Sequence, residues 1–113
     1  MLIMVAGPYS ADDALVRVAN LARMNDAAAA VMRLGHIPMI GVNAAFPVLE
    51  AAGHDFRHGW MMEISLSLAA RCDGCLLVAR SPGADREAES FSARGLPVWN
   101  RLEDIPPLAG ARR

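Results

Sequence analysis

The stretch CDGCLLVARSPGADREAESFSARGLPVW, residues 72–99, contains the pattern that decides the fold. Residues 75–79 form a short apolar run, which is typical of a buried strand in a parallel sheet. Residues 81–83, Ser-Pro-Gly, end this strand and begin a helix that Arg-Gly at 94–95 closes. Residues 97–99 predict the next strand. A strand, a helix and a second strand in this order indicate a parallel sheet with a crossover helix.

The rest of the chain alternates between strands and helices in the same way. Residues 1–6 are apolar on both faces, as expected of a central parallel strand, and a glycine turn follows at residues 7–10. A long helix is predicted to begin at a cap on Ser10 or Asp12 and to end near Leu34. The apolar residues of this helix recur at helical spacing, which predicts one buried face. The residues of that face are Ala14, Val18, Leu21, Ala22, Met24, Ala28, Val31 and Met32.

Three further segments complete the predicted domain. Residues 36–40 predict a second strand, and Pro38 places it at a sheet edge because proline lacks an amide donor. Residues 41–58 have no clean period and predict a long, partly helical loop, whereas residues 59–71 predict a helix. The buried face of that helix is expected to include Trp60, Ile64 and Leu68. Together the segments predict one α/β domain spanning residues 1–113, a three-layer parallel sheet of four to five strands with helices on both faces.

Composition argues against several classes of function. A hydrophobic content of 54% fits a buried parallel sheet or an apolar face used in self-association. The net charge is −1 and the basic residues are scattered apart from Arg112 and Arg113, so we expect no nucleic-acid partner. The apolar run at residues 1–6 is too short for a signal segment or a membrane span. We therefore expect a cytoplasmic protein with no membrane partner.

Two turns are expected to meet at the carboxyl edge of the sheet. One consists of Gly7, Pro8, Tyr9 and Ser10, and the other spans residues 81–83. Ligands of parallel sheets bind where neighbouring connections leave in opposite directions, which makes these turns the flanks of a candidate crevice. The Tyr9 hydroxyl is a candidate hydrogen-bond donor to a carboxylate in that crevice, and a packed surface tyrosine is the alternative.

Glu87 and the turn before it carry the candidate chemistry. A carboxylate near a helix N-terminus is favoured in its ionised form, which suits a nucleophile better than a general acid. The alternative is a surface glutamate that only complements the helix dipole. Ser81, Gly83 and Ala84 can present a hydroxyl and amides to a phosphate or sugar oxygen. Ser81 is also a candidate helix N-cap, and the two roles are compatible.

Cysteine and histidine give weaker signals. Cys72 and Cys75 form a C-x-x-C pair, and His54 and His58 are conceivable partners for a metal. The cysteine pair ends a helix and enters a strand, whereas redox pairs follow a strand and open a helix, so we expect no metal and no other cofactor. His36 is expected to be a structural histidine. The methionine pairs, Met1 with Met4 and Met61 with Met62, are expected to fill the core.

In combination, three segments resemble the nucleoside 2-deoxyribosyltransferase-like superfamily, most closely its short bacterial members of unassigned function. The segments are residues 5–9, residues 60–74 and residues 81–98. The resemblance extends to the branch that hydrolyses 2'-deoxynucleoside 5'-monophosphates at the N-glycosidic bond. It implies a flavodoxin-like fold and a glutamate, matched by Glu87, that attacks C1' of the sugar. The resulting glycosyl-enzyme is resolved by water in a hydrolase or by a second base in a transferase.

The resemblance also implies roles for other residues. Tyr9 matches a residue that helps to orient the glutamate. Ser81 stands where the transferases have an aspartate and the monophosphate hydrolases have a serine that holds the 5'-phosphate, which favours a phosphorylated substrate. Ser65 stands where the family usually has an aspartate that contacts the sugar hydroxyls. Because of Ser65, a nucleotide-binding module without turnover is the alternative to an enzyme.

The resemblance finally implies the surroundings of the site. The implied partner is a nucleoside or nucleotide, whose base needs an apolar slot lined by residues 41–56 and Trp60. Pockets of the family are often completed by a neighbouring subunit, so a homo-oligomer, a dimer or larger, is expected. An accessory protein that acts through oligomer contacts is a third possibility, for which the sequence offers no positive feature.

Overall fold

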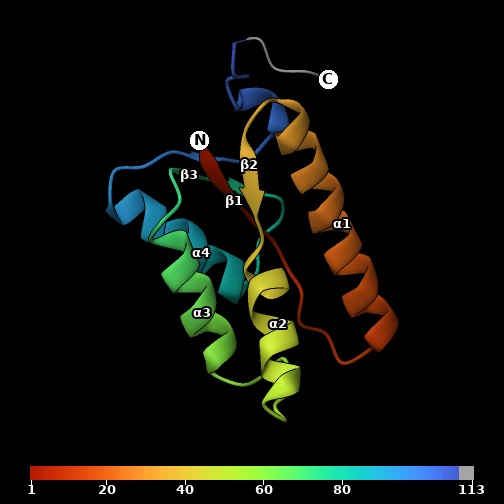
Figure 1. The fold of residues 1–113 in the computed structure, drawn as a ribbon. Helices are drawn as coiled ribbons and strands as arrows, with labels where there is room; N and C mark the ends of the chain where they lie inside the picture. Colours follow the sequence, from red (N-terminus) through yellow and green to blue (C-terminus); the bar gives the residue numbers. More distant parts are fainter. Residues whose placement is uncertain (110–113) are drawn as a thin grey trace.

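A parallel sheet of four strands lies at the centre of the computed structural model, which describes residues 1–109 (Figure 1). The strands are β1 (Leu2–Ala6), β2 (Ile37–Met39), β3 (Gly74–Leu77) and β4 (Val98–Trp99), in the order β2-β1-β3-β4. The predicted α/β class is therefore confirmed, and Pro38 does lie on an edge strand. The basic pair at Arg112 and Arg113 falls outside the described residues.

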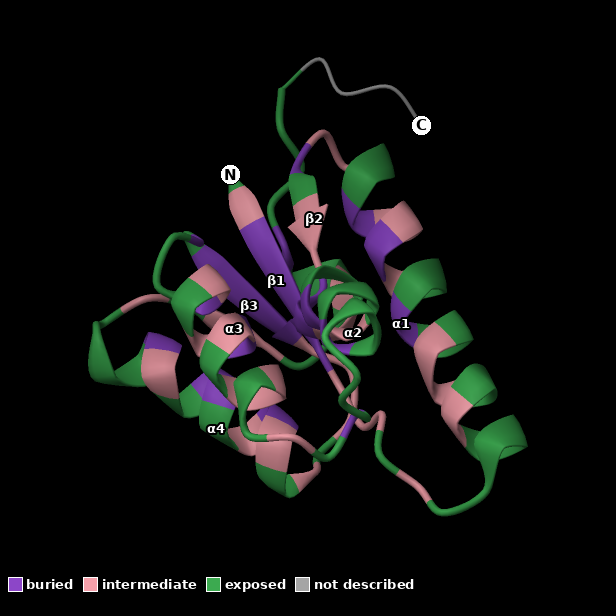
Figure 2. Cartoon of the chain, turned by 60° about the horizontal axis from the view of Figure 1, so that its bottom comes forward, coloured by how far each residue is buried: buried purple, intermediate pink, exposed green. Residues whose placement is uncertain are grey.

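Helices cover both faces of the sheet, which confirms the predicted three layers (Figure 2). α1 (Ala14–Arg33) covers one face, and α3 (Trp60–Ala69) and α4 (Pro82–Ala93) cover the other. β1 serves both cores because its side chains alternate: Ile3 and Val5 face α1, whereas Met4 and Ala6 face α3 and α4. The arrangement is consistent with a flavodoxin-like fold. Within residues 1–109, no helix has the length and apolar character needed to cross a membrane.

α2 (Gly41–Ala51) replaces much of the predicted loop. Its glycine, asparagine and internal Pro47 gave the sequence the appearance of a loop, but Ala45 and Leu49, one turn apart, are both buried. α2 packs closely along α3, and the two run in opposite directions as a helical hairpin (Figure 1). Packing on a neighbouring helix therefore outweighs the weak local preference for helix.

α1 differs from the prediction in its start and in its buried face. Asp13 is the N-cap, accepting a hydrogen bond of 2.8 Å from the Leu15 amide, so the predicted caps at Ser10 and Asp12 are wrong. Buried positions are confined to its second half, because a 20-residue helix spans about 30 Å and outruns these short strands (Figure 2). Met24, Ala28 and Val31 are buried and Leu21 is partly buried, whereas Ala14, Val18, Ala22 and Met32 are exposed.

α3 also presents a different face from the one predicted. Trp60 is half exposed, and Ile64 and Leu68 are only partly buried, whereas Ser65 and Ala69 are buried. The helix is apolar on several sides, so spacing alone did not distinguish the side that faces the core. The placement of Ser65 matters for the site described below.

His36 has the structural role that was predicted. The ring is buried, with Nδ1 3.1 Å from the Met1 nitrogen and Nε2 2.7 Å from the carbonyl oxygen of Pro106. Because a carbonyl only accepts, Nε2 carries the proton and Nδ1 accepts from Met1. The ring thereby ties the segment after the short 3-10 helix (Leu102–Asp104) to the edge of the sheet.

Candidate functional site

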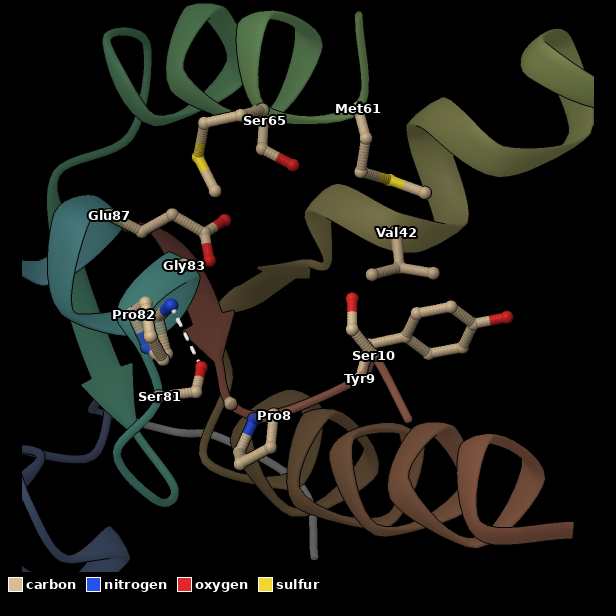
Figure 3. Close-up of a pocket in the computed structure, with 13 residues that line it drawn as sticks. Pro8, Tyr9, Ser10, Val42, Met61, Ser65, Ser81, Pro82, Gly83 and Glu87 are labelled. Carbon is tan, nitrogen blue, oxygen red and sulfur yellow. Dashed lines mark hydrogen bonds between the residues drawn. The ribbon is translucent and has the colours of Figure 1, made fainter. Parts of the chain in front are cut away.

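A cavity of about 260 Å³ opens at the carboxyl ends of the neighbouring strands β1 and β3 (Figure 3). β1 leads to α1 on one face of the sheet, and β3 leads to α4 on the other, so the cavity lies where the connections diverge. All nine residues predicted for the site line it. The complete lining is Gly7, Pro8, Tyr9, Ser10, Val42, Met61, Met62, Ser65, Ser81, Pro82, Gly83, Ala84 and Glu87.

Glu87 is the buried acid of this cavity. It lies in the second turn of α4, is only 8% exposed, and directs its carboxylate into the cavity (Figure 3). Within the described part of the chain, no hydrogen bond or ion pair reaches that carboxylate. Burial raises the pKa of Glu87 from its ordinary 4.5 to about 7.

The raised pKa of Glu87 overturns the expectation that the helix dipole favours its ionised form. The dipole acts mainly within the first turn of a helix, and Glu87 lies beyond that turn. Removal of water from the carboxylate is therefore the dominant effect, and it favours the neutral acid. Near neutral pH the two protonation states are present in comparable amounts.

Ser81 is the N-cap of α4, as predicted. Its hydroxyl oxygen accepts a hydrogen bond of 3.1 Å from the Ala84 amide, and Pro82 occupies the first helical position. Because proline has no amide hydrogen and the Ala84 amide is already bonded, the Gly83 amide is the donor left at this helix end. Ser81 and Gly83 thus offer a hydroxyl and an amide on one wall of the cavity.

Tyr9 lines the cavity but directs its ring away from Glu87 (Figure 3). The ring packs against Phe46 and Phe56, with centroids 6.0 and 5.7 Å away. In residues 1–109 no hydrogen bond joins the Tyr9 hydroxyl to the Glu87 carboxylate. In this conformation Tyr9 therefore lacks the contact that the family resemblance implies.

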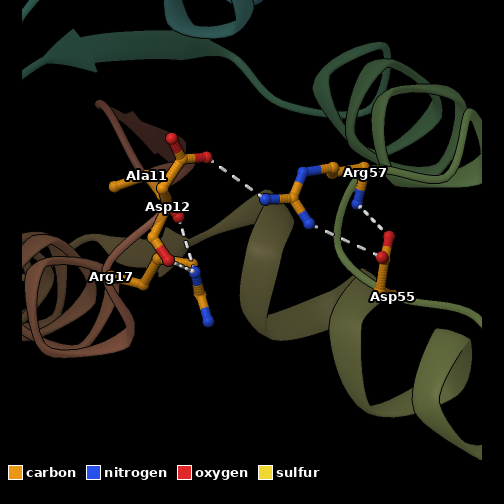
Figure 4. Close-up of polar contacts among 5 residues, drawn as sticks. All are labelled: Ala11, Asp12, Arg17, Asp55 and Arg57. Carbon is orange, nitrogen blue, oxygen red and sulfur yellow. Dashed lines mark hydrogen bonds and ion pairs between the residues drawn. The ribbon is translucent and has the colours of Figure 1, made fainter.

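Two arginines, Arg17 and Arg57, pack on the Phe56 ring and form a polar network with Ala11, Asp12 and Asp55 (Figure 4). The guanidinium carbons of Arg17 and Arg57 each lie 4.5 Å from the Phe56 ring centroid. Arg57 also pairs with Asp12 at 3.4 Å and with Asp55 at 3.7 Å. The network joins the turn after β1 to the loop between α2 and α3. Its ion pairs are exposed to water, so they add little to the free energy of folding. Their main effect is to hold the two segments in position.

Gly41, the first residue of α2, is a part of the site that the sequence did not reveal. A Cβ atom added at Gly41 would lie 2.1 Å from the Ser65 Oγ and 3.0 Å from the Glu87 Oε2. Only glycine lets the start of α2 approach the serine and the carboxylate so closely. Its position directly after a strand, at the carboxyl edge of the sheet, is the one sequence signal that could have drawn attention to it.

The apolar wall also differs from the prediction. Met61 and Met62, expected in the core, are partly buried and line the cavity with Val42. Trp60, expected to line a slot for a base, lies outside the cavity. Flexible thioethers suit a wall that contacts a flat apolar ligand.

The cysteines lie apart from the cavity lining. Both are buried free thiols in the core under α3 and α4. Burial raises the pKa of Cys72, and burial together with the nearby Glu87 charge raises the pKa of Cys75 to about 12. His54 and His58 stack on each other at 3.9 Å. Among residues 1–109, no three His, Cys, Asp or Glu side chains are grouped to hold a metal ion.

Comparison with known proteins adds no family to these observations. No protein-family model matches the chain, and no curated protein matches its sequence. The geometry of the cavity is therefore the basis for a functional proposal.

Proposed function

We propose that the protein is an N-glycosidase that cleaves a nucleoside or a nucleoside 5'-monophosphate, with Glu87 as the nucleophile. The observation that carries this proposal is the unpaired Glu87 carboxylate, buried in the wall of a cavity it shares with a helix N-terminus. A carboxylate without a protein partner is free to act on a ligand. The resemblance of the sequence to a superfamily of nucleoside-cleaving enzymes supports the same assignment.

The chemistry needs two displacements at C1' of the sugar. In the first, an oxygen of the ionised Glu87 bonds to C1' as the C1'–N bond breaks, and the base leaves with the bonding electrons and takes a proton from water. In the second, water adds to C1', loses a proton and releases the Glu87 carboxylate. Both steps pass through oxocarbenium-like states that a nearby carboxylate stabilises.

The walls of the cavity suit the two ends of a nucleotide. The Ser81 hydroxyl and the Gly83 amide stand at a helix N-terminus, where a phosphate is stabilised by the dipole. The opposite apolar wall of Val42, Met61 and Met62 suits a base. Phosphate binding would supply energy that positions the sugar against Glu87.

The test is base release from a panel of nucleosides and their 5'-monophosphates, followed by chromatography. We expect base release by the parent protein and a loss of about 10⁴-fold in Glu87→Ala, because the nucleophile is removed. Glu89→Ala, which alters an exposed acid of the same helix, is the control and should retain activity. Equal turnover by Glu87→Ala and the parent would refute the assignment.

The phosphate subsite makes a separate prediction for Ser81→Asp. Aspartate is as good an N-cap as serine, so the free energy of unfolding should change by less than about 0.5 kcal/mol. The added carboxylate would repel a 5'-phosphate, and we expect monophosphate cleavage to fall at least about 10-fold while nucleoside cleavage is retained. Comparison of kcat/KM for the two substrate types measures this. Unchanged monophosphate cleavage would place the phosphate elsewhere, and a parallel loss for both substrates would mean that the substitution disturbs a part of the site that both share.

A nucleotide-binding module without turnover is the second candidate. It is favoured by Ser65 in place of the family aspartate and by the Tyr9 ring that faces away from Glu87. Calorimetry that detects micromolar nucleotide binding without base release would support this candidate over the enzyme. Adding a free base to the panel distinguishes a hydrolase from a deoxyribosyltransferase, because only the transferase would form a new nucleoside.

A further inference from the structure

The lining of the cavity has few groups that can give or take a proton. Of the described residues that line it, only Tyr9 and Glu87 have an ionisable side chain, and none is a lysine, an arginine or a histidine. The Tyr9 ring is directed away from Glu87 (Figure 3). Glu87 itself must be ionised to bond to C1', so it cannot donate a proton in the same step. The described lining therefore holds no general acid for the departing base.

The charge of the base decides how much this matters. A base that leaves a neutral nucleotide takes the electron pair of the C1'–N bond and is an anion until it gains a proton. A base joined to the sugar through a quaternary ring nitrogen is already positively charged, so the same electron pair makes it neutral. Such a base departs without a proton. A site with a nucleophile and no acid suits this kind of leaving group.

A positively charged ring would also supply the partner that Glu87 lacks. Its carboxylate is buried, and within residues 1–109 no hydrogen bond or ion pair reaches it. Arg80, next to the lining residue Ser81, is exposed and pairs with Asp85 at 3.0 Å. Burial of an unpaired charge is unfavourable, and an opposite charge nearby offsets that cost. A cationic ring beside Glu87 would therefore stabilise the ionised form that attacks C1'.

The remaining walls fit the other parts of such a ligand. Val42, Met61 and Met62 form an apolar wall that suits a flat ring, and polarisable thioethers make favourable contacts with aromatic rings. The helix N-terminus at Ser81 and Gly83 suits an anion. The cavity thus complements a molecule with a cationic ring at one end and a phosphate at the other.

We propose that the cavity selects a nucleotide whose base is joined to the sugar through a quaternary ring nitrogen, an N-glycosylpyridinium 5'-monophosphate. A Glu87 oxygen bonds to C1' as the C1'–N bond breaks, and the electron pair of that bond neutralises the ring nitrogen. Water then adds to C1', gives one proton to the solvent and releases the carboxylate. The cleavage steps rest on the proposed function, whereas the preference in binding does not.

Calorimetry of the full chain with carbocyclic nicotinamide mononucleotide tests the preference in binding. A methylene group replaces the sugar ring oxygen of this probe and prevents cleavage. Its reduced dihydropyridine form has nearly the same shape and the same phosphate but no charge on the ring. At pH 8 we expect the parent to bind the oxidised form at least about 10-fold more tightly than the reduced form.

Variants and pH assign this preference to Glu87. Glu87→Gln should bind the two forms equally, whereas Glu89→Gln, which changes an exposed acid of α4, should keep the preference. The preference should also fall at pH 5, because burial raises the pKa of Glu87 to about 7 and the acid is then neutral. Cys75, the other titratable group near Glu87, has a pKa raised to about 12 and stays a neutral thiol at both pH values.

Three results would overturn the inference: equal affinity of the parent for the two forms at pH 8, a preference that persists in Glu87→Gln, or no binding of either form. Turnover separates such a failure from a failure of the proposed function. We expect kcat/KM for base release from nicotinamide mononucleotide to exceed that for adenosine and uridine 5'-monophosphates at least about 10-fold. Base release from the neutral nucleotides with equal binding of the two probes would refute the inference and retain the glycosidase. A charge preference in binding without base release from any nucleotide would refute the glycosidase and retain the ligand class.

Discussion

Glu87→Gln is expected to stabilise the fold increasingly as the pH rises, with the gain over the parent growing by about 3 kcal/mol between pH 4 and pH 8. The pKa of Glu87 is 4.5 when water reaches the group and about 7 in the folded chain. Below pH 4.5 Glu87 is neutral in both the folded and the unfolded chain, so its burial causes no pH-dependent loss of stability. Between pH 4.5 and pH 7 Glu87 ionises only in the unfolded chain, so the parent loses stability as the pH rises. Above pH 7 Glu87 ionises in both states and the loss grows no further.

Urea unfolding of parent and variant at several pH values measures this gain. Glutamine keeps the size of the side chain and cannot ionise, so the pH-dependent part of the difference belongs to Glu87. Glu89→Gln changes an exposed acid of α4 and is the control, for which a difference independent of pH is expected. A pH-independent difference for Glu87→Gln would mean that its carboxylate is hydrated. If Glu87 is the nucleophile, base release should rise with pH through the same midpoint.

Gly41→Ala is expected to lower the free energy of unfolding by about 2 kcal/mol and base release by about 100-fold. The Ser65 Oγ can rotate away from the new methyl group, but the Ser65 Cβ, 2.8 Å from it, cannot. α2 must therefore move relative to α3. Such a shift changes the walls of the cavity beside the Glu87 carboxylate.

A double variant tests the cause of that loss. Gly41→Ala combined with Ser65→Gly removes both serine atoms that the methyl group meets, so part of the stability should return despite the cost of a helical glycine. Gly59→Ala is the control, because a Cβ there meets nothing within 4 Å. Stability and base release are measured for all four chains. Parent-like values for the single variant would show that α2 approaches Glu87 less closely than described.

Local sequence rules predicted the sheet and part of the helices for physical reasons that need no tertiary structure. The strands were recognised from apolar runs of strand length. One helix was bounded by its start at Ser81 and its end at Gly95, and both signals depend only on residues close in sequence. Residues 41–51 were predicted only as part of a long, partly helical loop, because the helix there depends on packing against α3. The exposure of Val18 was missed because periodicity contains no information on where the sheet ends.

The sequence predicted which residues line the site better than it predicted how they are arranged. The turns at residues 7–10 and 81–83 follow adjacent parallel strands, so the topology alone brings them together. The raised pKa of Glu87 was not predictable, because it depends on how closely α2 and α3 cover the carboxylate. Gly41 acquires its role through Ser65, 24 positions further along the chain, a relation that no local pattern expresses.

The cavity draws its lining from four separate segments, from Gly7 in the first turn to Glu87 in α4. No short fragment of the chain contains all of the lining residues, and bringing Gly7 beside Glu87 closes a loop that includes most of the domain. Contacts so distant in sequence have the largest loop-closure entropy cost, so we expect them to form late in folding. Ligand binding would therefore report on the completely folded chain, and a partly folded intermediate that retains the α2–α3 hairpin would not bind.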